Sequence, residues 1–138
     1  MTTFVDTSAF YALLSAEDPS HPAASVAWAS IQERHDTLIT TSYVLLETVS
    51  LIQRRLGMQA AREFHADFIP LLTVSWVDSQ RHARAMDALL IIGRRDLSLV
   101  DCVSFEAMRA LDVDTAFAFD GHFAQQGFTC IPEATATN

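Results

Sequence analysis

Short β-favouring runs alternate with amphipathic helical stretches along most of this chain, and that alternation restricts its fold more than any other feature. The predicted strands are residues 3–6, 37–40, 72–77 and 115–119, with a further edge strand at 128–131. Strands that alternate with helices form parallel sheets with helices on both faces. We therefore predict an α/β fold with three α/β/α layers around a central parallel sheet of four to five short strands.

Apolar periodicity and the positions of capping and breaking residues place the predicted helices. Thr7 or Ser8 caps the first helix, and Gly57 closes the third. The predicted helices cover residues 10–14, 22–34, 43–56, 58–68, 79–92 and 98–111, followed by a short helix from Phe123. At 138 residues the chain fits one domain, which we place at residues 1–132, followed by a flexible tail at residues 133–138.

The composition is acidic and excludes several function classes. Nine arginines and no lysine face seventeen acidic residues, which gives a net charge of −8, so the overall field does not attract nucleic acid. The absence of lysine also argues against a phosphate-binding P-loop. The two cysteines, Cys102 and Cys130, lack metal-ligand spacing and are predicted to be free thiols. With no apolar run near the ~18 residues of a membrane span, we expect a soluble cytoplasmic protein.

Four acidic residues directly follow apolar runs, a context that most of the other acids lack. Asp6 and Asp120 would end strands, whereas Glu47 and Asp101 would lie in the first turns of helices. Because parallel strands end, and the following helices start, at one edge of the sheet, we expect the four to converge. Clustered carboxylates raise one another's pKa, and a divalent cation removes that conflict. Oxygen ligands predict Mg²⁺, with Mn²⁺ as the alternative.

Each of these acids also has an ordinary structural interpretation. Asp6 fits a helix N-cap, and Asp120 fits a turn. Ser98 and Asp101 match a capping box. By helical periodicity alone Glu47 lies on a solvent-exposed face. The four acids together favour a metal site more strongly than any one of them does.

The order and spacing of these acids resembles the pattern of the PIN-domain ribonucleases. The segments that carry the resemblance are Asp6-Thr7-Ser8, Glu47 on its helix, Asp96 to Asp101 opening a late helix, and Asp120-Gly121-His122-Phe123 after a strand. Length and loop layout are similar to the VapC-type toxins of bacterial toxin–antitoxin pairs. The resemblance extends from residue 3 to about residue 131.

This resemblance implies a metal-dependent endoribonuclease that hydrolyses RNA phosphodiester bonds as the toxin of a toxin–antitoxin pair. The positions that match the family's catalytic and metal-binding acids are Asp6, Glu47, Asp101 and Asp120. Thr7 matches a small hydroxyl residue that orients the acids or binds a substrate phosphate. The resemblance also implies RNA as substrate, a cognate antitoxin as partner, and a homodimer formed by exposed apolar faces of the first two helices. Where some relatives carry another acid, this chain has His122.

Two other functions fit a small acidic α/β domain. A non-catalytic RNA-binding version of the fold would bind metal without turnover, and the intact set of four acids argues against it. A receiver-like signalling domain also places carboxylates at strand ends, but it relies on a lysine that this chain lacks.

Overall fold

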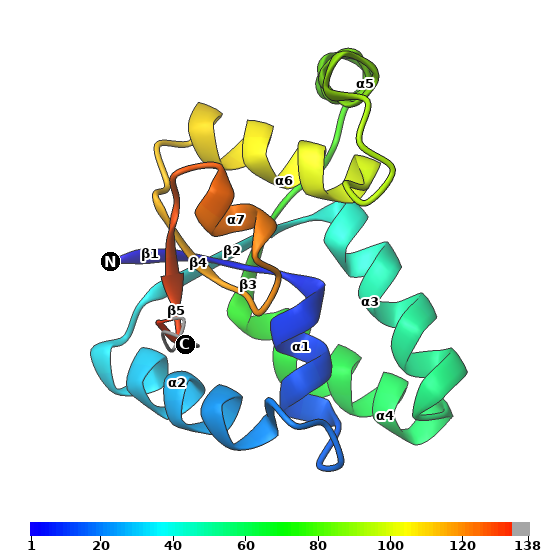
Figure 1. Cartoon of the computed structure of the whole chain (residues 1–138). Coiled ribbons are helices and arrows are strands. Elements are labelled where there is room, and N and C mark those ends of the chain that lie inside the picture. The colour runs from blue at the N-terminus through cyan, green and yellow to red at the C-terminus, as the bar shows by residue number, and fades with distance from the viewer. Residues whose placement is uncertain (134–138) are drawn as a thin grey trace.

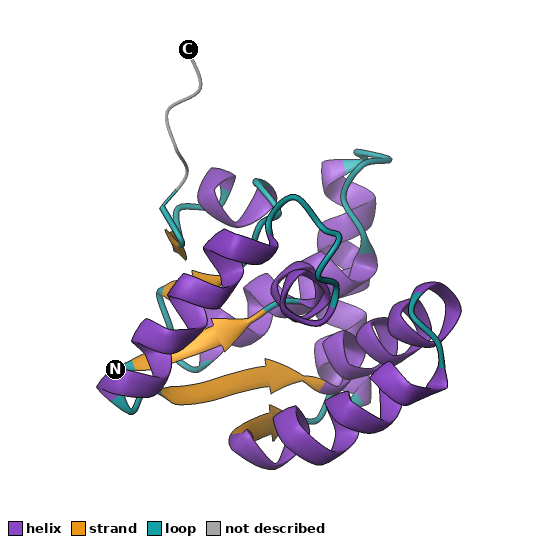
Figure 2. Ribbon diagram, turned by 90° about the horizontal axis from the view of Figure 1, so that it is seen from below, coloured by secondary structure: helices purple, strands orange, loops and turns teal. Residues whose placement is uncertain are grey.

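A single parallel sheet of five strands forms the centre of the protein in a computed structural model that describes residues 1–133. The strand order is β3-β2-β1-β4-β5, and the arrows in Figure 2 point the same way. The strands are β1 (Thr2–Val5), β2 (Thr37–Thr41), β3 (Leu72–Ser75), β4 (Thr115–Phe117) and β5 (Thr129–Ile131). The predicted sheet of four to five short parallel strands is therefore confirmed.

Helices cover both faces of this sheet, as predicted. They are α1 (Thr7–Leu14), α2 (His21–Arg34), α3 (Ser42–Arg55), α4 (Met58–Glu63), α5 (Ser79–Ile92), α6 (Leu99–Ala110) and α7 (His122–Gln125). Figure 1 shows α6 and α7 on one side of the sheet and α1, α2 and α4 on the other. Fully buried aromatic rings fill both interfaces, with Phe10 against Phe64 in one layer and Phe105 against Phe123 in the other.

Two predicted strands are too long, and side-chain hydrogen bonds explain why. The strand predicted at 72–77 ends at Ser75, because the Val77 N–H donates to the Ser42 hydroxyl at 2.9 Å. The strand predicted at 115–119 ends at Phe117, and the Phe119 N–H donates to the Ser8 hydroxyl at 2.9 Å. In both places the backbone N–H bonds to a side chain of a helix that is distant in sequence, and not to the neighbouring strand.

The helix predicted at residues 58–68 is confirmed in its bounds, but only its first half is α-helical. The α-helix α4 ends at Glu63, after which a π-helical turn (Phe64–Phe68) and a 3₁₀ turn (Ile69–Leu71) follow. Pro70 has no N–H to donate, so the α-helical ladder cannot continue through it.

The carboxyl edge of the sheet is where the helices begin. Asp6 and Asp78 come after β1 and β3, and Thr41 ends β2; the side chain of each accepts a backbone N–H in the first turn of the helix that follows. Ser98 caps α6 in the same way. These four caps fix the positions of the polar residues that line this edge.

Some sequence predictions concern the ends and the surface of the chain. Cys102 and Cys130 are free thiols, as predicted, the first buried and the second half-buried. The tail predicted at 133–138 lies, apart from Glu133, outside the described residues. Within residues 1–133, no helix has both the length and the apolar character needed to cross a membrane.

Candidate active site

Asp6 lies directly beyond β1, with 4% of its surface exposed. Its Oδ2 accepts hydrogen bonds from the Ser8 backbone N–H at 3.1 Å and from the Ser8 hydroxyl at 2.6 Å. Burial raises the pKa of Asp6 to about 7; the Ser8 bonds oppose this rise, and the charges of Asp101 and Asp120 add to it. Among the described residues no donor is bonded to Oδ1, which leaves that oxygen available to a cation.

The expectation that Thr7 or Ser8 replaces Asp6 as the helix cap is wrong. Asp6 itself is the N-cap of α1. The cap uses only Oδ2, so capping and cation binding employ different oxygens of the same carboxylate.

Asp101 occupies the third position of α6 and forms the predicted capping box with Ser98. Its Oδ2 accepts the Ser98 N–H at 3.3 Å, and its own N–H donates to the Ser98 hydroxyl at 3.0 Å. Asp101 is 8% exposed. Burial, followed by the charge of Asp120, raises the pKa of this carboxyl above its ordinary value. The charge of His122 opposes this rise only in part, so the cap holds a carboxylate whose ionised form is disfavoured.

Asp120, in the loop before α7, and His122, the first residue of α7, complete the group. Asp120 Oδ1 accepts the His122 backbone N–H at 2.9 Å and lies 2.7 Å from His122 Nδ1. His122 Nδ1 is also 3.7 Å from Asp101 Oδ2. One ligand atom from each of these three residues lies within 4.8 Å of the other two. Such spacing allows the three side chains to share one cation.

A further acid, Asp96, contacts the other ring nitrogen of His122. His122 Nε2 lies 3.4 Å from Asp96 Oδ2, and Asp96 forms an ion pair with Arg94 at 2.6 Å. The hydrogen bonds from Arg94 and His122 lower the pKa of Asp96 to about 2. Asp96 thus has the cationic partner that the acids of the site lack.

Positive charge is scarce where the acids meet. Within residues 1–133 no arginine forms an ion pair with Asp6, Asp101 or Asp120, and His122 is the one basic side chain in contact with them. Divalent cations that prefer oxygen, such as Mg²⁺ and Mn²⁺, supply the missing charge. The donor set therefore fits such an ion: Asp101 and Asp120 have the spacing to hold it, with His122 beside them, and Asp6 lies near enough for their charges to raise its pKa.

Glu47 is set apart from these acids. Because α3 begins at Ser42, Glu47 lies in the second turn of the helix and not in its first. It is half-buried and lines a pocket of about 310 Å³ together with Leu99 and Val100 at the start of α6. The structure thus brings Asp101 and Asp120 together with His122, leaves Asp6 near them but outside that group, and places Glu47 beside the residues that lead into Asp101.

Thr7 and Ser8, the hydroxyl residues after Asp6, point in different directions. Thr7 is 5% exposed; its hydroxyl donates to the Val44 carbonyl at 3.4 Å and accepts from the Thr48 hydroxyl at 3.0 Å. Those bonds join α1 to α3. The hydroxyl that contacts Asp6 belongs to Ser8, which also accepts the Phe119 N–H and so links the segments after β1 and β4.

The sequence-based site prediction missed the roles of Ser8 and His122, although one local rule connects both to acids. In each case an aspartate side chain accepts the backbone N–H of the second residue after it, from Asp6 to Ser8 and from Asp120 to His122. Aspartate commonly forms this turn. Applying the rule to the predicted acids would have placed both residues next to the site.

Comparison with known proteins gives one family model and close relatives that cover nearly the whole chain. The family model described as PIN domain matches residues 3–128. The chain is 36% identical over 126 residues to the 23S rRNA-specific endonuclease VapC20 of Mycobacterium tuberculosis, which covers 91% of this chain and 94% of that protein.

Solved structures with the same fold include that relative. The crystal structure of VapC20, described as a sarcin–ricin loop cleaving toxin, superposes with a TM-score of 0.82 at 34% identity and covers 94% of this chain and 97% of the other. VapBC2 from Rickettsia felis, crystallised with a promoter DNA fragment, shares the fold at 11% identity, with a TM-score of 0.69 and coverage of 94% and 97%.

Proposed function

The chain belongs to the PIN-domain family, as its pattern of acids predicted, and from this premise we propose that it is a metal-dependent endoribonuclease, the toxin of a toxin–antitoxin pair. VapC20, to which it is similar along nearly its whole length, cleaves the sarcin–ricin loop of 23S rRNA. We propose the same loop as the substrate of this chain.

One observation carries the proposal: three acids from separate segments lie close enough for their charges to interact, and within residues 1–133 no arginine pairs with them. Asp6 follows β1, Asp101 opens α6, and Asp120 precedes α7. Burial raises the pKa of Asp6 to about 7 and so opposes the ionisation of this carboxyl at neutral pH. Helix caps and turns do not require carboxylates to lie close together, so the clustered charges favour a functional site.

The proposed roles follow from the contacts. Asp6, Asp101 and Asp120 hold Mg²⁺ or Mn²⁺, which when bound supplies a Lewis acid and an activated water for phosphodiester hydrolysis. Ser8 fixes Asp6 by its Oδ2 and leaves Oδ1 for the metal. Glu47, beside the start of α6, would add a fourth carboxylate near the metal.

The contacts of Thr7 and His122 favour roles in positioning the acids. The Thr7 hydroxyl is engaged between α1 and α3, so we assign Thr7 to positioning Asp6 and not to contact with a substrate phosphate. His122 lies between Asp120 and Asp96, where it orients the Asp120 carboxylate.

The partners also follow from charge and exposed apolar surface. An arginine inserted by a cognate antitoxin would pair with the uncompensated carboxylates and displace the metal. A homodimer was predicted through the first two helices, where Val26 of α2 is 73% exposed. Leu90 and Ile91 at the end of α5 are 70% and 84% exposed and offer a second apolar contact for it. We place the protein in the cytoplasm with its ribosomal substrate.

The proposal is tested with purified protein that has been freed of any bound inhibitor. It is incubated with total cellular RNA in Mg²⁺ or Mn²⁺, and the new 5′ ends are mapped by sequencing. We expect one dominant cut in 23S rRNA that disappears with chelator and with Asp101→Asn. Asp87→Asn, an exposed acid on α5, is the matched control and should cut as the wild type does.

The outcomes separate the parts of the proposal. A dominant cut elsewhere in the transcriptome keeps the endoribonuclease and rejects the sarcin–ricin loop. Equal cleavage by wild type and Asp101→Asn would identify a contaminating nuclease, and no cleavage in either metal would reject the enzymatic function.

A further inference from the structure

A pocket of about 310 Å³ lies next to the acids, with Glu47 in its wall. Its lining residues come from α3, α5 and the start of α6: Tyr43, Leu46, Glu47, His82, Leu99 and Val100. Apart from Glu47, these side chains are aromatic or aliphatic, with His82 as the one basic group. A volume near 300 Å³ is at the small end of the range for ligand pockets.

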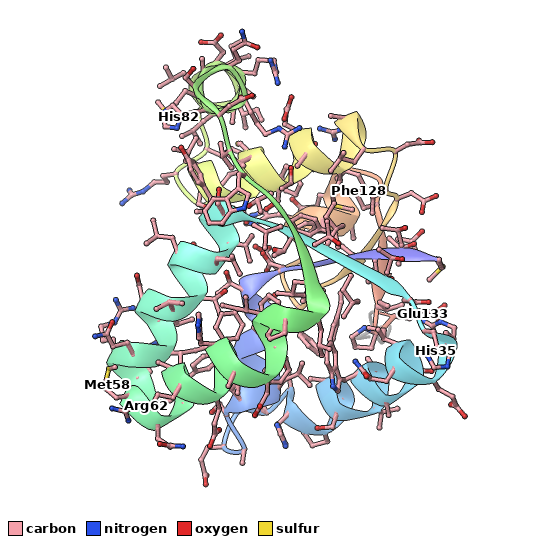
Figure 3. All side chains as sticks on the ribbon, turned by 180° about the vertical axis from the view of Figure 1, so that it is seen from behind. His35, Met58, Arg62, His82, Phe128 and Glu133 are labelled. Atoms are coloured by element: carbon pink, nitrogen blue, oxygen red, sulfur yellow. The ribbon has the colours of Figure 1, made fainter. Side chains whose placement is uncertain are left out.

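Hydrogen bonds between α3 and α5 hold the walls of this pocket in place. The Tyr43 hydroxyl bonds to His82 Nδ1, and the two rings meet edge to face with centroids 5.8 Å apart. The Ser42 hydroxyl accepts the Val77 N–H, and the Asp78 side chain caps α5. Both aromatic residues are half-buried, and Figure 3 labels His82 on α5. The pocket is thus preorganised and needs no folding of a loop.

The chemistry of the lining favours a flat, uncharged group. Within the described residues no arginine lines the pocket, and Glu47 repels anions, so a phosphate does not fit. Leu46 is 69% exposed and adds accessible apolar surface to the wall of the pocket. Aromatic and aliphatic walls of this kind bind unstacked nucleobases.

The position of the pocket connects it to the reaction. Leu99 and Val100 lead directly into Asp101, and Glu47 lines the pocket on the side of α3. A nucleotide whose phosphate lies at the acids therefore has its base within reach of this pocket.

We propose that the Tyr43–His82 pocket binds the unstacked base of a nucleotide adjacent to the scissile phosphate, and thereby positions single-stranded RNA on an otherwise acidic enzyme. The inference rests on the proposed endoribonuclease function. Stacking and apolar contact do not require positive charge, which explains how a chain with a net charge of −8 can hold RNA at this edge.

The test combines protein variants with RNA that lacks single bases. The probe is a synthetic hairpin of the sarcin–ricin loop, and each nucleotide around the mapped cut is replaced in turn by an abasic one. Cleavage is measured for wild type, Tyr43→Leu and Leu46→Ala, with Leu111→Ala, an exposed leucine at the other end of α6, as the control. Tyr43→Phe keeps the ring and removes only the hydroxyl bond to His82.

We expect Tyr43→Leu and Leu46→Ala to raise KM roughly 5- to 100-fold with little change in kcat, since stacking contributes to binding. One abasic position should raise KM equally, and combining it with Tyr43→Leu should add no further loss. Tyr43→Phe should stay within about threefold of the wild type. Cleavage that is normal in both variants, or losses that multiply, would overturn the pocket assignment while leaving the nuclease intact.

Binding provides a readout that does not depend on turnover. Fluorescence anisotropy of the labelled hairpin is measured with Asp101→Asn and with Asp101→Asn combined with Tyr43→Leu. Weaker binding by the double variant supports the pocket even if the wild type cuts nothing, and equal or absent binding rejects it. If Leu46→Ala instead turns a dimer into a monomer in light scattering, the pocket is occupied by a second copy of the chain. If the variant loses only antitoxin binding, the pocket is occupied by the antitoxin. Either result rejects the base-binding assignment.

Discussion

Two buried carboxylates lie near opposite ends of strand β1, and the charges around them have opposite signs. Near its start, the Thr3 hydroxyl donates to Asp36 at 3.2 Å, and Asp6 lies directly beyond its end. The Asp36 side chain is 1% exposed and the Asp6 residue 4%. One sheet therefore carries a withdrawn acid at its amino edge and another at its carboxyl edge.

At the amino edge, positive charge surrounds the acid. Arg34 forms an ion pair with Asp36 at 2.9 Å, and the amino group of Met1 lies 3.9 Å away. Burial raises the pKa of Asp36, but the hydrogen bonds and charges of Arg34, the Thr3 hydroxyl and the amino terminus outweigh it, so the pKa is below its ordinary value. This acid is satisfied by the protein itself.

At the carboxyl edge the acid is left with other acids. Asp101 and Asp120 raise the pKa of Asp6 in addition to the larger effect of burial, and only the two hydrogen bonds from Ser8 oppose them. The comparison teaches that burial alone does not mark a functional carboxylate. The missing counter-charge does, because it leaves a place for a cation.

Replacing Asp6 and Asp36 in turn by asparagine should give the largest difference in activity between the two edges. Asp6→Asn removes a metal oxygen and should lower kcat/KM by roughly 10³-fold or more, since such ligation contributes several kcal/mol. Asp36→Asn should leave cleavage within about twofold of the wild type, because it lies at the opposite edge of the sheet. Steady-state cleavage of the hairpin RNA checks both. Equal losses in the two variants would contradict the functional difference between the edges.

Asp101 separates capping from metal binding. Asp101→Asn keeps an oxygen that can accept the Ser98 N–H, but it removes a charge, so Mn²⁺ affinity should fall at least about tenfold. Ser98→Ala removes the cap hydroxyl and keeps the charge, so it should lower stability by about 1 kcal/mol with little change in affinity. Isothermal titration with Mn²⁺ and thermal unfolding measure the two effects, and the reverse pattern would assign Asp101 to the cap alone.

The two edges should also differ in pH dependence. Without metal, folded Asp6 keeps its proton up to about pH 7 whereas the unfolded chain loses it near pH 4, so the stability contributed by this group falls as pH rises between these values. Asp6→Asn should therefore be more stable than metal-free wild type at pH 8, by up to about 4 kcal/mol. Urea unfolding with chelator present tests this, and an Asp6→Asn protein that is less stable at pH 8 would refute it.

Asp36 has the opposite sign. Its lowered pKa contributes stability above pH 4 that is lost as pH falls through the folded value. Asp36→Asn should cost about 1 kcal/mol at pH 7, because the pair with Arg34 is partly exposed, and this cost should shrink as pH falls through the folded pKa; urea unfolding across this pH range measures it.

The smallest expected effect concerns the hydrogen bonds that restrain Asp6. Ser8→Ala removes the hydroxyl bond that lowers the pKa of Asp6, so that pKa should rise, and the pH at which cleavage is half-maximal should rise with it. Thr7→Ser, which keeps its hydroxyl between α1 and α3, is the matched control and should leave the profile unchanged. A lower kcat at every pH with no displacement of the profile would mean that Ser8 only stabilises the fold.

The same contrast explains how far the sequence could predict the fold. The alternation of periodicities is a local property, so the sheet, the layers and most helix starts were predictable. The ends of β3 and β4 were not, because the N–H groups of Val77 and Phe119 bond to hydroxyls 35 and 111 residues away. No local pattern contains those partners.

The site was predictable to the extent that topology determines it. Asp6, Asp101 and Asp120 come together because the parallel sheet brings strand ends and helix starts to one edge. The position of Glu47 depends on the residue at which α3 begins, which periodicity fixes only to within a turn. The absence of an arginine beside the acids depends on where every arginine of the fold points, and only the structure supplies that.

Carbon-13 NMR of the Asp6 and Asp36 carboxyl carbons in one sample tests the central claim most directly. In metal-free protein, Asp6 should titrate with a pKa of about 7 and Asp36 below its ordinary value. Saturating Mg²⁺ should lower the pKa of Asp6 and leave Asp36 unchanged. If Asp6 titrates near 4 and does not respond to Mg²⁺, the carboxyl edge has no uncompensated charge, and the assignment of this edge as the metal site is wrong.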